Sequence, residues 1–226
     1  MGTRQLRQPI APQHWVIITI VLFVLTFALG FLVRLVPAIG AAQLPLDVAL
    51  NRQHSAALDA LAGALDHLDQ PVVVAVILLV TFAVLWVVRD WSTALITCIV
   101  AGAGWVSCLV VKYVVHEPRP VIADLPHSLN ISPATLSYPS GHVAFVAALA
   151  TALFLVASQR APRVAIVVVF AVLSLLVSVS RLYIGVHYLS DTIGGALNGV
   201  AGALLVAGLI SLILRRMRPR VSTPAE

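Results

Sequence analysis

Six long apolar runs are the feature that most constrains how this chain can fold. They cover residues 15–36, 71–88, 93–115, 143–158, 164–184 and 193–214. A helix needs about 20 mostly apolar residues to cross the hydrocarbon core of a bilayer. Only 10% of the 226 residues are charged, whereas soluble domains carry about 25%. We therefore predict one all-α, polytopic membrane domain over residues 1–226, with six transmembrane helices.

Two of the runs differ from an ordinary span. The run at 143–158 is short, so we expect its ends to include neighbours such as His142. The run at 15–36 follows Arg4 and Arg7, as the core of a signal peptide would. Its apolar stretch is longer than the roughly 7–15 residues of a signal core. A retained membrane anchor is therefore favoured over a cleaved signal.

Basic residues are unevenly divided between the two sides of the predicted bundle. With a cytoplasmic N-terminus, nine of the 14 Lys and Arg residues lie in inner segments and five in outer ones. Because cytoplasmic connections are enriched in Lys and Arg, both termini are predicted to be cytoplasmic. This topology accounts for the net charge of +5, so we expect no nucleic-acid partner. The Ala-, Val- and Arg-rich composition favours a bacterial plasma membrane.

The segment between residues 46 and 69 has a different pattern from the apolar runs. Its leucines recur near the helical period, with polar and charged residues between them. This pattern predicts one amphipathic helix lying at the outer membrane interface, either as a connector or as a lid. The connector is favoured. The residues that carry the pattern are Leu50, Leu58, Leu61, Leu65 and Leu68, interleaved with Asn51, Arg52, Asp59, Asp66 and Asp69.

The last apolar run contains glycines that permit close helix approach. Gly195 and Gly199 have the small-xxx-small spacing. They could serve either dimerisation or packing within one bundle, and we favour packing. The sequence does not fix the oligomeric state.

Ionisable residues from three separate stretches are predicted to meet at the outer face. Charged groups in or beside a span are costly, so their default interpretation is functional. The stretches contain Lys112 and Arg119; Ser140, Gly141 and His142; and Arg181, His187 and Asp191.

Five of these residues have the chemistry of a phosphate site. Lys112, Arg119 and Arg181 supply one point charge and two planar forks that match phosphate oxygens. Ser140 and Gly141 stand at a predicted helix start. There the free backbone N–H groups favour an anion, and glycine permits close approach.

The other three residues have the chemistry of nucleophilic and acid–base catalysis. His187 and Asp191 are four residues apart, so they share a helix face if the last helix begins early. A carboxylate on one ring nitrogen fixes the tautomer and leaves the other nitrogen to attack. His142 is available as a general acid–base. These three residues are also possible metal ligands, but the nearby cations already supply the charge of a metal, so we expect no metal or other cofactor.

Together, the three stretches resemble the motifs of the type 2 phosphatidic acid phosphatase superfamily, which are membrane lipid phosphate phosphatases. Lys112 is followed after six residues by Arg119-Pro120. Pro139-Ser140-Gly141-His142 comes next. Ser180-Arg181 is then followed by His187 after five residues and by Asp191 after three more. All three motifs are complete and in order.

The resemblance implies a mechanism and a class of substrate. His187 would form a phosphohistidine, with Asp191 orienting its ring and His142 acting as acid and then base. The cations, with Ser140 and Gly141, would hold the phosphate without magnesium. The expected substrate is a lipid phosphate in the bilayer: a polyprenyl diphosphate, phosphatidylglycerophosphate or phosphatidic acid. A lipid phosphotransferase and a non-catalytic lipid-phosphate binding or transport protein remain alternatives.

Overall fold

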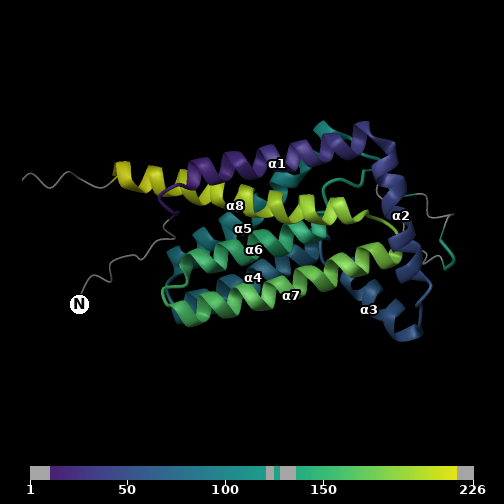
Figure 1. Cartoon of the computed structure of the whole chain (residues 1–226). Helices are drawn as coiled ribbons and strands as arrows, with labels where there is room; N and C mark the ends of the chain where they lie inside the picture. Colours follow the sequence, from purple (N-terminus) through teal and green to yellow (C-terminus); the bar gives the residue numbers. More distant parts are fainter. Residues whose placement is uncertain (1–10, 121–124, 128–135, 218–226) are drawn as a thin grey trace, which may run out of the picture.

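The computed structural model describes residues 11–120, 125–127 and 136–217. The terminal basic residues used in the topology prediction, Arg4, Arg7, Arg218 and Arg220, lie outside these ranges. Within the described residues the chain is all-helical, as predicted. The helices are α1 (Trp15–Leu35), α2 (Pro37–Asn51), α3 (Ala56–Asp66), α4 (Pro71–Val88), α5 (Trp91–Val115), α6 (Gly141–Val156), α7 (Arg160–Ile184) and α8 (Leu189–Met217) (Figure 1).

Five of these helices are long and apolar enough to cross a membrane: α1, α4, α5, α7 and α8. Helix α6 is apolar but has only 16 residues. It begins with Gly141 and His142, so the last two residues of the Pro-Ser-Gly-His motif belong to its first turn. The all-α membrane architecture is confirmed, and a sixth span through α6 stays a prediction.

Helix α8 lies at the centre of the bundle, in contact with α1, α5 and α6 (Figure 1). Helix α7 contacts α6, and its C-terminal part lies beside α2 and α3. The short helices α2 and α3 therefore cover one end of the bundle. That end is where α5 and α7 finish and where α6 and α8 begin.

Glycines set the close contact between α6 and α8. A Cβ atom on Gly195 would lie 2.5 Å from the carbonyl oxygen of Ser140, and one on Gly199 would be closer still to that of Ala144. The small-xxx-small pair thus packs against α6 of the same chain. That occupied face is not available for dimerisation.

The prediction of one amphipathic helix between residues 46 and 69 is wrong, because two helices occupy this region. Helix α2 begins earlier, with Pro37 at its first turn, and ends at Asn51. The backbone is extended at Ser55, whose hydroxyl caps α3 by accepting the Leu58 N–H at 3.3 Å. A serine cap competes with continuation of the helix, and the leucine spacing does not reveal that competition.

Candidate active site

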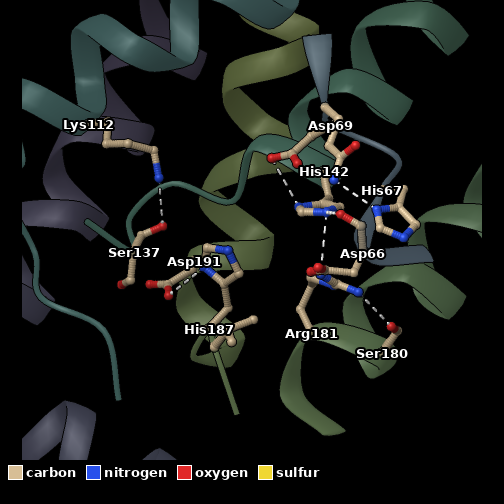
Figure 2. A network of polar contacts seen from close by, with 12 residues as sticks. Asp66, His67, Asp69, Lys112, Ser137, His142, Ser180, Arg181, His187 and Asp191 are labelled. Atoms are coloured by element: carbon tan, nitrogen blue, oxygen red, sulfur yellow. Dashed lines mark hydrogen bonds and ion pairs between the residues drawn. The ribbon is translucent and has the colours of Figure 1, made fainter. Parts of the chain in front are cut away.

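Most of the predicted site residues lie at the bundle end covered by α2 and α3. Figure 2 shows two groups of polar contacts side by side. One contains Lys112, Ser137, His187 and Asp191, and the other contains Asp66, Asp69, His142, Ser180 and Arg181. Because the helices run antiparallel, stretches distant in the sequence meet at this end.

His187 and Asp191 form a buried pair across the turn between α7 and α8. Helix α7 ends at Gly185, which has a φ of 75°, and α8 begins at Leu189. The Nδ1 atom of His187 lies 3.2 Å from Oδ2 of Asp191, and the same oxygen accepts the Tyr188 N–H at 2.9 Å. His187 and Asp191 are 1% and 0% exposed. With Nδ1 engaged by the carboxylate, Nε2 is the ring atom left for another partner.

The electrostatic surroundings keep His187 neutral. Burial lowers the pKa of His187 well below its usual value, and the positive charges of Arg119 and Lys112, followed by His142 and Arg181, lower it further. A lowered imidazole pKa keeps the ring unprotonated at neutral pH. The Nε2 lone pair is therefore available to an electrophile.

His142 is held by two groups from the end of α3 and the turn that follows it. Its Nδ1 lies 3.1 Å from Oδ2 of Asp69, and its Nε2 lies 3.0 Å from the carbonyl oxygen of Asp66. The sequence pattern puts both aspartates on the polar side of the predicted connecting helix and predicts no further role for them. The spacing offers no signal for their contact with His142, because the contact depends on how α3 packs against α6 and α7.

Arg181 is fully buried in the last turn of α7. Its Nη1 donates to the carboxylate of Asp66, and its Nη2 donates to the Ala62 carbonyl and the Ser180 hydroxyl, both at 3.0 Å. The nitrogen Nη1 also lies 3.3 Å from Nε2 of His142. Arg181 therefore joins Asp66, at the end of α3, to His142.

Lys112 and Arg119 hold backbone segments that border the site. The ammonium of Lys112 donates to the carbonyls of Leu136 at 3.0 Å and Ser137 at 3.2 Å. Arg119 Nη1 donates at 3.1 Å to the carbonyl of Val186, directly before His187. The two cations are thus fixed beside the nucleophile candidate.

Several buried polar groups of the site have no hydrogen-bond partner among the described residues. They include Nε of Arg119, Nε of Arg181 and the hydroxyl of Ser140. Ser140 is the N-cap of α6, yet its side chain makes no capping bond. Buried donors are nearly always satisfied in folded proteins, so these donors are candidates to bind the acceptor oxygens of a ligand. The oxygens of a phosphate would satisfy them.

A carboxylate already lies against the start of α6. A Cβ atom on Gly141 would be 2.8 Å from Oδ2 of Asp69, so a larger residue there would require this carboxylate to shift. Burial raises the pKa of Asp69, but His142 and the charges of Arg181 and Lys112 outweigh it, and the net pKa is lowered. The helix start and the basic groups thus favour an anion at this position.

Residues 91–215 match the PAP2 superfamily. The chain belongs to this superfamily. It is 27% identical over 132 residues to phosphatidylglycerophosphatase B of Bacillus subtilis (strain 168), a match that covers 56% of this chain and 62% of that relative. The match therefore spans less than two thirds of the relative's length.

Two solved structures resemble the PAP2 fold of this chain. A transmembrane PAP2 type phosphatidylglycerolphosphate phosphatase from Bacillus subtilis superposes with a TM-score of 0.71 at 21% identity. The match covers 88% of this chain and 98% of that one. LpxE of Aquifex aeolicus gives a TM-score of 0.54 at 26% identity, covering 76% and 95%. The family fold thus extends over most of the chain, beyond the three motifs.

Proposed function

We propose that this PAP2 protein is a metal-independent phosphatase that hydrolyses a membrane lipid phosphate or diphosphate through a phosphohistidine. The observation that carries the proposal is the buried His187–Asp191 pair. Its imidazole is neutral, its Nδ1 is engaged, and three cations lie around it. A neutral, oriented imidazole beside unpaired phosphate donors suits attack on phosphorus.

In the first step, Nε2 of His187 attacks phosphorus and the bond from phosphorus to the lipid oxygen breaks. His142 gives a proton to the departing oxygen. Lys112, Arg119 and Arg181, with the Ser140 hydroxyl and the Gly141 amide, hold the three equatorial oxygens, on which charge spreads in the transition state. Asp191 keeps the Nδ1–H tautomer of His187 and stabilises the phosphohistidine.

In the second step, His142 takes a proton from water, and the oxygen of that water attacks the phosphohistidine. The phosphorus–nitrogen bond breaks, inorganic phosphate leaves and neutral His187 is restored. His142 must gain and lose a proton in each cycle, and the neighbouring carboxylate of Asp69 stabilises its protonated form. We assign Asp69 and Asp66 as positioning residues for His142 and Arg181.

The substrate class follows from the setting of the site. Apolar helices surround it, and the predicted topology puts it at the headgroup depth of the outer face of a bacterial plasma membrane. A lipid-borne phosphate can enter sideways from the bilayer. Phosphatidylglycerophosphate is supported by the names of the two Bacillus subtilis relatives. A polyprenyl diphosphate and phosphatidic acid are the other candidates.

The test is phosphate release by the purified full chain in detergent with EDTA present. Each candidate lipid is offered to the parent, to His187→Ala and to His14→Ala, an exposed histidine outside the site. The expected result is release that survives EDTA, persists in His14→Ala and is lost in His187→Ala. A 32P-labelled substrate should leave acid-labile label on the parent and on His14→Ala, but not on His187→Ala.

Each other outcome identifies a different function. Release that requires a second lipid or sugar would indicate phosphotransfer. Lipid binding that His187→Ala retains, with no turnover in either protein, would indicate a binding or transport protein. Loss of activity in EDTA that added Mg²⁺ restores would overturn the metal-independent mechanism.

A further inference from the structure

Two histidines and an aspartate lie together outside the candidate active site, at the end of the bundle covered by α2 and α3. His54 lies in the turn between α2 and α3, Asp59 in the first turn of α3, and His127 in the described segment 125–127. One ligand atom from each residue lies within 4.8 Å of the other two. The His54 and His127 rings are stacked with their centroids 4.1 Å apart.

Residues behind this cluster fix two of its three members. The hydroxyl of Tyr183 donates to Oδ1 of Asp59, which leaves Oδ2 pointing to His127. The side chain of Asn51 is fully buried. It accepts the backbone N–H of His127 and donates to the backbone carbonyl of His127, both at 2.8 Å. It also donates to the Tyr183 carbonyl at 2.9 Å. The bond from Tyr183 orients a ligand carboxylate, as supporting hydrogen bonds do at metal sites, and the bonds from Asn51 fix the backbone of His127.

The donor set suits a transition metal better than magnesium or calcium. Two imidazole nitrogens and one carboxylate oxygen match the mixed nitrogen and oxygen ligands of zinc, with a fourth position left for water. Magnesium and calcium prefer oxygen ligands throughout.

One pair of ligand atoms already has the spacing of a bound site. Zinc bonds of about 2.0–2.2 Å put neighbouring ligand atoms roughly 3.3 Å apart. His127 Nε2 and Asp59 Oδ2 already lie 3.2 Å apart. His54 is exposed, and its ring would have to turn out of its stack on His127 to take the third position. This exposure also gives a metal ion a path from solvent.

We propose that His54, Asp59 and His127 form a binding site for a zinc-like divalent transition metal, which fastens segment 125–127 to α3. The site does not depend on the proposed function. Its structural consequence reaches the nucleophile candidate, because Leu125 packs on Gly185 so closely that a Cβ atom there would overlap the leucine side chain. The metal thereby stabilises one wall of the turn that carries His187, without contacting the reacting atoms.

The test is calorimetric titration of the metal-stripped full chain in detergent with Zn²⁺ at neutral pH. The parent is expected to bind a single equivalent, and His54→Ala is expected to bind it at least about tenfold more weakly. His14→Ala, which removes another exposed histidine, should bind as the parent does. No binding by the parent, or equal affinity in His54→Ala, would overturn the proposal.

Thermal unfolding gives a second and independent readout. Because a ligand that binds only the folded state raises Tm, Zn²⁺ should raise the Tm of the parent and of His14→Ala. It should leave the Tm of His54→Ala nearly unchanged. A rise of the same size in all three proteins would place the metal elsewhere. Phosphate release in EDTA, measured on the same samples, reports separately on the proposed phosphatase function.

Discussion

Asp69 is placed to influence the proposed phosphatase reaction through the imidazole ring of His142. Its oxygen lies 3.1 Å from Nδ1 of His142. Asp69→Asn keeps the shape but loses the charge that stabilises protonated His142. A charge-assisted contact is worth about 1.5–3 kcal/mol, so we predict a fall in kcat of roughly 10- to 100-fold. Steady-state phosphate release measures it.

A positioning role for Asp69 predicts a particular pattern in the kinetics. KM should change little, because Asp69 is not assigned to hold the phosphate. The pH profile of kcat should change, because the charge beside the acid–base ring is lost. His67→Gln, an exposed change in the same segment, is the control and should leave kcat unchanged. A large rise in KM with an unchanged pH profile would assign Asp69 to substrate binding instead.

His187 supports a prediction about pH. Its pKa is lowered from 6.5, first by burial and then by the surrounding cations. The neutral, nucleophilic ring therefore persists as the pH falls through 6.5 and is lost only well below it. The rate constant of phosphoenzyme formation, measured by rapid quench between about pH 5.5 and 7.5, should show no step that belongs to His187. A tenfold fall per pH unit below 6.5, with an unchanged profile in Asp69→Asn, would contradict this.

At the scale of elements, the contact between α6 and α8 fixes the first turns of both helices, which carry His142 and Asp191. A methyl group on Gly199 would meet the Ala144 carbonyl in α6. The helices must separate to admit it, so Gly199→Ala should destabilise the fold by about 1–3 kcal/mol. Thermal unfolding in detergent measures the change.

Gly63 provides a matched control for that substitution. It also lies within a helix, α3, but a Cβ atom there would meet nothing within 4 Å. Gly63→Ala should therefore be neutral, or stabilising by up to about 1 kcal/mol through helix propensity. Equal losses of stability in both variants would show that the close approach of α6 and α8 is not the cause.

The sequence predicted the elements better than the contacts between them. The apolar run at 71–88 coincides with α4, because composition alone decides a lipid-facing helix. Helix α8 begins four residues before its predicted start. Its first turn contains polar residues such as Asp191, and a prediction based on apolar residues leaves these out. The contacts of Asp66 with Arg181 and of Asp69 with His142 could not be predicted, because they depend on the tertiary packing of α3.

At the scale of the whole molecule, the antiparallel course of the helices brings the three motifs, Asp66 and Asp69 to one end. Helices α5 and α7 finish at this end, and α6 and α8 begin there (Figure 1). A chain of this topology has its candidate active-site residues on one side of the bilayer. The side is set by the distribution of Lys and Arg, which predicts the outer face.

Cysteine labelling in intact cells tests that side. Gln53 lies in the exposed turn between α2 and α3, at the active-site end, and Gln159 lies in the exposed turn between α6 and α7, at the opposite end. A membrane-impermeant maleimide should label Gln53→Cys in intact cells and Gln159→Cys only after permeabilisation. The parent chain, with Cys108 buried and Cys98 half-buried, serves as the background control. The reverse pattern would put the active site in the cytoplasm, where its lipid substrate would have to come from the inner leaflet.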